Sequence, residues 1–202
     1  MRRSGPVKAS ARLSSLLGAN LAGQRVGLLG GSFNPAHEGH LHISKVAMAR
    51  LGLNRVLWLV SPQNPLKSEM GMAPLAARLM SARAMARHPA IIVTTIEQAL
   101  GTRFTIDTLL ALKQSAPRTR FVWLMGSDNV AALPRWRRWR EIAGIMPTLV
   151  IARPGSEISA RFAEAAQKLG ADPATRLSFA EARLHPASAT SIRARGLWSP
   201  AR

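Results

Sequence analysis

The sequence predicts an α/β fold in which one parallel sheet is flanked by helices. From Arg25 onward, short apolar runs of strand length alternate with longer segments of helical pattern. Such alternation favours βαβ units with right-handed crossovers, and these units give parallel strands. The size agrees, because 202 residues with 47% hydrophobic content can bury one ample α/β core but not two comfortable ones.

The expected strands are short runs rich in apolar and β-branched residues, bounded by Gly, Pro or Ser. They span residues 26–29, 55–60, 91–95, 120–125 and 148–152, with a further candidate at 177–180. The carboxyl ends of parallel strands meet at one edge of a sheet, where ligands of such folds bind. The segments that follow these strands are therefore expected to share one site.

Helices are expected in the connections between the strands. They span residues 38–51, 74–87, 104–114, 157–169 and 189–195. Gly52 suits the left-handed residue that commonly ends a helix, and Pro74 suits a first helical turn. Residues 61–72 contain prolines and Lys67, and this pattern predicts a long loop.

The chain is expected to comprise a basic extension over residues 1–22 and a single domain over residues 23–202. The extension is rich in Ser and Ala and lacks the sustained apolar core of a secretory signal. Its composition resembles a weak transit peptide, but we expect a poorly ordered cytoplasmic segment. The sequence has no run of about 18 apolar residues, so no membrane-spanning segment is expected.

The formal net charge of +18 favours polyanionic ligands, which include nucleotides, nucleic acids and anionic lipid surfaces. A genome rich in G and C also raises the arginine content, so the charge alone does not decide among these ligands. The chain has no cysteine, which excludes disulfides and cysteine-ligated zinc or iron–sulfur sites. An intracellular location fits this composition.

Residues 30–40 are the most informative segment: Gly-Gly-Ser-Phe-Asn-Pro-Ala-His-Glu-Gly-His. A strand, a glycine turn and a helix N-terminus direct backbone N–H groups and the positive end of the helix dipole at one place. His37 and His40 project from the same face of the first helical turn. The chain has neither a Walker phosphate loop nor a G-x-G-x-x-G turn after the first strand. The segment therefore indicates chemistry on a nucleoside triphosphate by a different device.

This segment resembles the signature of the HxGH nucleotidyltransferase superfamily. Within it, the pattern G-[ST]-F-[DN]-P-x-H-x-G-H is similar to that of the nicotinate-nucleotide adenylyltransferases. The related phosphopantetheine adenylyltransferases usually carry threonine where this chain has His37. A second segment, residues 188–193, is similar to the family signature I-S-[ST]-T-x-[IL]-R. Residues 126–128, 134–136 and 153–155 also match family segments in order.

The resemblance covers about residues 25–195 and implies a Rossmann-like nucleotidyltransferase fold. It also implies a cytoplasmic enzyme of NAD biosynthesis, which transfers the adenylyl group of ATP to nicotinate mononucleotide. The products are nicotinate adenine dinucleotide (deamido-NAD) and pyrophosphate. The attacking 5′-phosphate is already an anion, so the reaction needs no general base. The protein must instead align two phosphates and neutralise the charge that develops.

The resemblance implies catalytic roles for His37 and His40, with His40 stabilising the α-phosphate. The implied ATP-binding residues are Gly30, Gly31, Ser32, Phe33, His37, His40, Lys67, Ser188, Thr190 and Arg193. The implied nicotinate mononucleotide-binding residues are Gly31, Ser32, Asn34, Phe104, Thr105, Asp128, Trp136 and Arg153. Trp136 would stack on the pyridine ring, and backbone amides near Phe104 would bind its carboxylate. Mg²⁺ would accompany ATP through water and phosphate ligands, without an assigned protein side chain.

The sequence departs from the family pattern at several positions. Asn34 stands where many relatives have aspartate, and Ala187 replaces a usual isoleucine. The loop that contains Lys67 lacks the usual double proline followed by His-Lys. The chain ends nine residues after Arg193, where relatives often continue with further helix.

Other functions stay open at this point. The acceptor could be nicotinamide mononucleotide or phosphopantetheine. From a different class, the net charge and the Arg/Trp run at residues 135–140 suggest a nucleic-acid-binding protein on a degenerate nucleotidyltransferase fold. For that run we expect instead a helix with arginines toward solvent and Trp139 packed inward. The intact His37 and His40 pair argues against a pure binding module. Homo-oligomerisation is left open.

Overall fold

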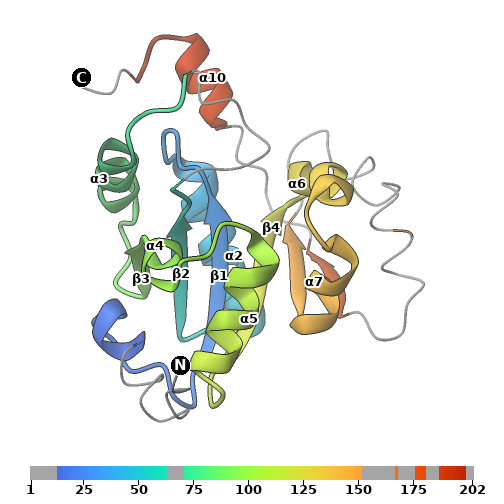
Figure 1. Ribbon diagram of the computed structural model, residues 1–202. Helices are drawn as coiled ribbons and strands as arrows, with labels where there is room; N and C mark the ends of the chain where they lie inside the picture. The colour runs from blue at the N-terminus through green and yellow to red at the C-terminus, as the bar shows by residue number, and fades with distance from the viewer. Residues whose placement is uncertain (1–12, 63–70, 152–166, 168–175, 181–186, 199–202) are drawn as a thin grey trace.

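The fold is seen in a computed structural model that describes residues 13–62, 71–151, 167, 176–180 and 187–198 (Figure 1). One sheet has six strands in the order β3-β2-β1-β4-β5-β6, and each neighbouring pair is parallel. The strands are β1 (Arg25–Gly31), β2 (Arg55–Val60), β3 (Ile91–Thr94), β4 (Arg120–Gly126), β5 (Thr148–Ile151) and β6 (Leu177–Ala180). The predicted fold class is confirmed.

Helices occupy most of the connections between strands. They are α2 (Glu38–Leu51), α3 (Leu75–Met85), α4 (Ile96–Leu100), α5 (Thr105–Ser115), α6 (Ser127–Ala132), α7 (Trp139–Ile145) and α10 (Ala189–Ala194), with a 3-10 turn η1 (Leu133–Arg135). The sequence did not predict α4 and α6, because a helix of one or two turns has too few residues for a helical period to show. The expected helix at 157–169 lies, apart from residue 167, outside the described residues. No helix in the described part of the chain is long and apolar enough to cross a membrane.

Separate apolar clusters cover the two faces of the sheet. In Figure 1, α5 crosses in front of the sheet and α2 lies behind it. Strand β2 divides between the faces, since Leu57 and Leu59 belong to one cluster and Val56, Trp58 and Val60 to the other. Burial on both faces explains why this strand is an uninterrupted apolar run.

Strand β1 lies at the centre of the sheet, between β2 and β4. The chain builds outward from β1 to β3, then returns to the other side of β1 and builds outward again through β4, β5 and β6. The strand order therefore reverses between β1 and β4. In sheets of this kind the crevice outside the carboxyl ends of these two strands is the usual ligand site.

The N-terminal segment differs from expectation. Residues 13–17 are helical, and Leu13, Leu17 and Leu21 are buried in the apolar cluster that α5 and α7 help to form. The Leu21 carbonyl accepts a hydrogen bond from Thr119 Oγ1 at 2.9 Å. The expectation of a poorly ordered extension is corrected for residues 13–22, and the residues before them lie outside the described part. Leu13 and Leu17 lie one helical turn apart and share a face of this short helix, whereas Leu21 follows the turn after it.

Candidate active site

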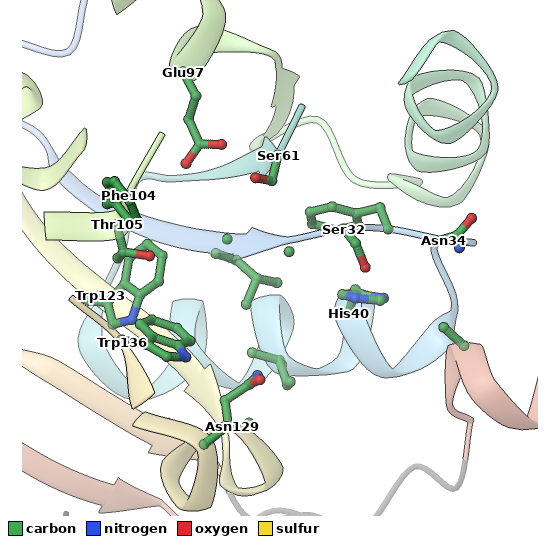
Figure 2. A pocket seen from close by; sticks show the side chains of 18 of the residues that line it. Ser32, Asn34, His40, Ser61, Glu97, Phe104, Thr105, Trp123, Asn129 and Trp136 are labelled. Atoms are coloured by element: carbon green, nitrogen blue, oxygen red, sulfur yellow. The ribbon is translucent and has the colours of Figure 1, made fainter. Parts of the chain in front are cut away.

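A cavity of about 420 Å³ opens at the carboxyl ends of β1, β2 and β4 (Figure 2). This volume is within the range of about 300–1,000 Å³ typical of small-molecule sites. The predicted site residues on its lining are Gly30, Gly31, Ser32, Phe33, Asn34, His37, His40, Phe104, Thr105, Trp136, Ser188 and Thr190. Residues from distant parts of the sequence therefore share one cavity.

Four predicted site residues are not among the described residues that line the cavity: Lys67, Asp128, Arg153 and Arg193. Arg193 donates a hydrogen bond from Nη1 to the Asn34 carbonyl. Asp128 lies in α6, directly beyond the carboxyl end of β4. Lys67 and Arg153 lie outside the described residues.

The cavity has two ends that differ in chemistry. Figure 2 shows Ser32 and His40 toward one end and Phe104, Trp123 and Trp136 toward the other. We call the first, formed by Ser32, Phe33, His37 and His40, the histidine end. We call the second, formed by Phe104, Thr105, Trp123 and Trp136, the aromatic end.

The two histidines cap the N-terminus of α2. His37 is the N-cap residue, and its Nδ1 accepts the Gly39 N–H at 3.2 Å. In return, the His37 N–H donates to His40 Nδ1 at 3.2 Å. This reciprocal pair satisfies N–H groups that a helix start otherwise leaves without partners. A neutral ring whose Nδ1 accepts a hydrogen bond carries its proton on Nε2, so Nε2 is the donor of each imidazole.

Aromatic packing holds the imidazoles in place. The rings of His37 and His40 have centroids 3.9 Å apart, and Phe33 lies 4.6 Å from His40. Phe33 in turn stacks on Trp58 at 5.2 Å. Trp58 Nε1 donates to Ser44 Oγ at 2.8 Å, and that hydroxyl donates to the His40 carbonyl at 2.9 Å. Nothing in the sequence separates Trp58 from other strand residues, so this support was not predicted.

Gly39 has a steric role between the two histidines. A Cβ at this position would lie 2.9 Å from His37 Nδ1 and 3.1 Å from the Ala187 carbonyl oxygen. Real Cβ atoms essentially never come within 3.0 Å of a heavy atom. The glycine therefore lets the capping imidazole and the segment before α10 approach the start of α2 together.

The second motif reaches the cavity through the start of α10. Ser188 is the N-cap residue, and its Oγ accepts the Ser191 N–H at 3.1 Å. Ser188 and Thr190 line the cavity. The hydrogen bond from Arg193 to the Asn34 carbonyl joins two motifs that lie 159 residues apart.

The Asn34 side chain stabilises the loop after β1 by bonding to the segment before α3. It is 3% exposed, its Nδ2 donates to the Gly71 carbonyl at 2.9 Å, and its Oδ1 accepts the Ala73 N–H at 3.2 Å. These two bonds connect the segment after β1 to the segment before α3. Asparagine can make both, because it carries a donor and an acceptor, whereas an ionised aspartate only accepts.

The aromatic end contains a tryptophan pair. Trp136 meets Trp123 edge to face, with ring centroids 6.4 Å apart and an interplanar angle of 77°. Trp123 packs against β1 where Gly30 has no side chain, since a Cβ there would lie 2.5 Å from Trp123 Cη2. Flat aromatic walls of this kind suit a planar ring ligand. The sequence did not identify Trp123 as a site residue, because it lies within a uniformly apolar strand.

Arginines also line the cavity near the aromatic end. They are Arg103, Arg135 and Arg137. The Arg137 guanidinium lies 4.8 Å from the centre of the Phe104 ring and 3.9 Å from the Asp107 carboxylate. A cluster of cations at a concave surface favours anionic ligands.

Glu97 is the acidic residue on the described lining of the cavity. Burial raises the pKa of its carboxyl group, and hydrogen bonds with Ser61 and Thr108 act in the opposite direction. The Thr108 hydroxyl lies 3.3 Å from Glu97 Oε1. The sequence did not predict this residue, since it belongs to the short helix α4.

The Arg/Trp run at residues 135–140 is not one helix. Arg138 adopts a left-handed conformation with φ 51°, which separates η1 from α7. Trp139 is 7% exposed and belongs to the core, so its expected inward packing is confirmed. The Arg140 guanidinium lies 4.7 Å from the centre of the Trp139 ring. The tryptophans of the run are therefore occupied by the core and by the cavity wall.

Comparison with known proteins agrees with these two motifs. The family model of cytidylyltransferase-like proteins matches residues 28–195, which include both. The chain belongs to the cytidylyltransferase-like family. A relative from Parvibaculum lavamentivorans is named "probable nicotinate-nucleotide adenylyltransferase". It is 53% identical to this chain, with 88% of this chain and 94% of that protein aligned. A protein of the same name from Ruegeria pomeroyi is 49% identical, with 89% and 90% aligned.

A solved structure shares the fold of this chain. The Plasmodium falciparum nicotinic acid mononucleotide adenylyltransferase, complexed with NaAD, superposes with a TM-score of 0.69 at 15% identity. The superposition covers 85% of this chain and 83% of that chain. This superposition supports the fold, and the family model and the two relatives confirm the family resemblance expected from residues 30–40 and 188–193.

Proposed function

We infer that this protein transfers the adenylyl group of ATP to nicotinate mononucleotide, giving deamido-NAD and pyrophosphate, in NAD biosynthesis. The observation that carries the inference is the meeting of both motifs at one cavity, where the histidine-capped start of α2 faces the serine-capped start of α10. Relatives that are 53% and 49% identical over most of the chain carry the name of this activity. The activity follows from this site and these relatives together.

The histidine end provides what adenylyl transfer requires. The acceptor phosphate attacks the α-phosphate of ATP, the bond to the bridging oxygen breaks, and pyrophosphate leaves with that electron pair. No proton has to be removed from the attacking oxygen. Imidazole Nε2–H donors at a helix N-terminus stabilise the negative charge that develops on the α-phosphate. We assign the closer contact with the α-phosphate to His40, which is half-buried, whereas His37 is 3% exposed.

The aromatic end suits the pyridine ring of the acceptor. Trp136 and Trp123 offer aromatic surface, and Phe104 and Thr105 begin α5. Phe104, the N-cap residue, makes no side-chain cap, so the first N–H groups of α5 have no capping side chain. Such N–H donors, with the nearby arginines, match a carboxylate that only accepts hydrogen bonds. This favours the acid mononucleotide over the amide.

We propose that Mg²⁺ enters with ATP as part of the substrate complex. Among the residues that the structure describes, no group of three or more His, Asp or Glu side chains is placed to hold a metal ion. Mg²⁺ commonly keeps several water ligands and binds substrate phosphates, which requires no such group. The ion would shield the charge of the triphosphate.

An acceptor panel tests the proposed function. Pyrophosphate release from ATP is measured with nicotinate mononucleotide, nicotinamide mononucleotide and phosphopantetheine in parallel. We expect the highest kcat/KM with nicotinate mononucleotide. With nicotinamide mononucleotide, the N–H donors at the start of α5 would face the N–H group of the ligand amide and could not all form hydrogen bonds. Equal or better kcat/KM with either other acceptor would refute the assignment.

A further inference from the structure

Arg78 is a buried arginine that lies outside the cavity lining. It belongs to helix α3, and its exposed fraction is 1%, although arginine side chains usually lie at the surface. None of the ion pairs in the described part of the chain involves it. A buried charge without a carboxylate partner is costly unless hydrogen bonds satisfy it.

Backbone carbonyls supply those hydrogen bonds. Arg78 Nη1 donates to the carbonyls of Ser32 at 2.8 Å and Ser61 at 2.6 Å, and Nη2 donates to that of Pro62 at 2.7 Å. Nε donates to the Ala73 carbonyl at 2.9 Å. The planar guanidinium has five N–H donors in a rigid fork, so one side chain connects the segments after β1 and β2 with the segment before α3.

These bonds act on the walls of the active-site cavity. Ser32 and Ser61 both line it. The Ser61 N–H also donates to the Gly31 carbonyl at 3.0 Å, and Glu97 forms a hydrogen bond with the Ser61 side chain. The spacing between the segments after β1 and β2 is therefore held by several bonds, and the Arg78 side chain contributes to it by bonding to both segments.

The bond to Ser32 also sets the direction of the next N–H group. The peptide that joins Ser32 to Phe33 is planar, so its N–H points opposite to the carbonyl that Arg78 holds. Phe33 itself has φ 47°, in the left-handed region that non-glycine residues rarely adopt. Such a conformation persists where surrounding contacts hold it. The ring of Phe33 packs 4.6 Å from His40.

We propose, on the basis of the proposed function, that Arg78 is a positioning residue for adenylyl transfer. Its guanidinium holds the turn after β1 in the shape that places Phe33 against His40, and holds that turn at a set distance from Ser61. Its positive charge also lies directly behind the wall of the histidine end. Because Arg78 lies outside the cavity lining, its substitution should affect the chemical step more than binding of the mononucleotide.

Two substitutions at this site test the proposal. Arg78→Lys keeps the positive charge but loses the planar set of five N–H donors. Arg78→Ala leaves a space that methylguanidinium can fill. Arg83→Lys and Arg83→Ala are matched controls, since Arg83 is exposed on the same helix. The kcat and both KM values come from pyrophosphate release, scaled to the folded fraction measured by circular dichroism.

We expect folded Arg78→Lys to lose about tenfold or more in kcat, with the KM for nicotinate mononucleotide changed by less than about twofold. Added methylguanidinium should restore part of the kcat of Arg78→Ala, while the Arg83 variants match the wild type with and without it. If Arg78→Ala does not fold, the lysine variant alone decides.

A folded Arg78→Lys protein with wild-type kcat would overturn the proposal. So would a loss of activity that only follows the folded fraction, or a lysine variant that does not fold, because Arg78 would then serve the fold and not the reaction. Wild-type protein that releases no pyrophosphate in the same assay would refute the proposed function instead. The two failures are therefore distinguishable.

Discussion

The histidine end and the aromatic end of the cavity are built in different ways. At the histidine end, His37, Gly39 and His40 bond to one another within four residues of sequence. At the aromatic end, Trp123 comes from β4, Trp136 from the turn after η1, and Phe104 from the start of α5. The difference indicates that the reacting groups depend on a local motif, whereas the surface for the acceptor is assembled from separate elements.

The largest effect should come from His40→Ala at the histidine end. We expect kcat to fall by about 100-fold or more, with a smaller change in the KM for ATP, because a donor to the transition state is lost. Steady-state pyrophosphate release measures both. His88→Ala is the control, since His88 lies outside the cavity lining and should keep the wild-type kcat. An unchanged kcat in His40→Ala would remove the role assigned to this imidazole.

Gly39→Ala tests how closely the two motifs must approach. The new Cβ would displace the His37 ring and the Ala187 backbone, so we expect kcat to fall by roughly tenfold. Gly144→Ala is the matched control, because a Cβ there meets nothing within 4 Å. It should leave kcat unchanged and raise the free energy of unfolding by up to about 1 kcal/mol. Equal kcat in both variants would show that the approach has no catalytic consequence.

Trp136→Ala tests the aromatic end separately. We expect the KM for nicotinate mononucleotide to rise by about five- to tenfold, in line with the loss of about 1 kcal/mol of aromatic stacking. The KM for ATP should stay close to that of the wild type. Trp136→Phe keeps an aromatic face and should recover most of the affinity. If the KM for ATP rises instead, Trp136 belongs to the ATP side of the site.

Glu97→Gln should have the smallest effect, and it concerns stability. Burial raises the pKa of the Glu97 carboxyl, so the folded state favours its neutral form. The stability that this preference contributes is present below the unfolded pKa and is lost as the pH rises through the raised folded pKa. Glutamine stays neutral, so Glu97→Gln should have a higher Tm than the wild type near neutral pH, and the difference should disappear in acid.

Thermal unfolding at several pH values checks this expectation. Glu141→Gln is the control, because Glu141 is exposed and its hydrogen bond with Arg138 lowers its pKa. That variant should show no gain in Tm at neutral pH. A gain in Glu97→Gln that does not depend on pH would mean that charge burial is not its cause.

The sequence predicted the strands well, because runs buried on both faces are apolar throughout. It missed α4 and α6, which are too short to show a helical period. It also missed Glu97 and Trp123, whose places on the cavity wall depend on which strands become neighbours. The N-terminal segment was expected to be poorly ordered because of its basic, Ser- and Ala-rich composition, and a helix of five residues is too short to show a helical period.

The sequence by itself determined the strand–glycine–helix unit and its paired histidines. Hydrogen bonds between residues a few positions apart require only local backbone geometry, so residue types and spacing specify them. Tertiary structure alone decided that Arg193 reaches Asn34, that Trp123 packs under Gly30 and that Arg78 connects the segments after β1 and β2. Those contacts depend on the strand order, which places distant segments at one edge of the sheet.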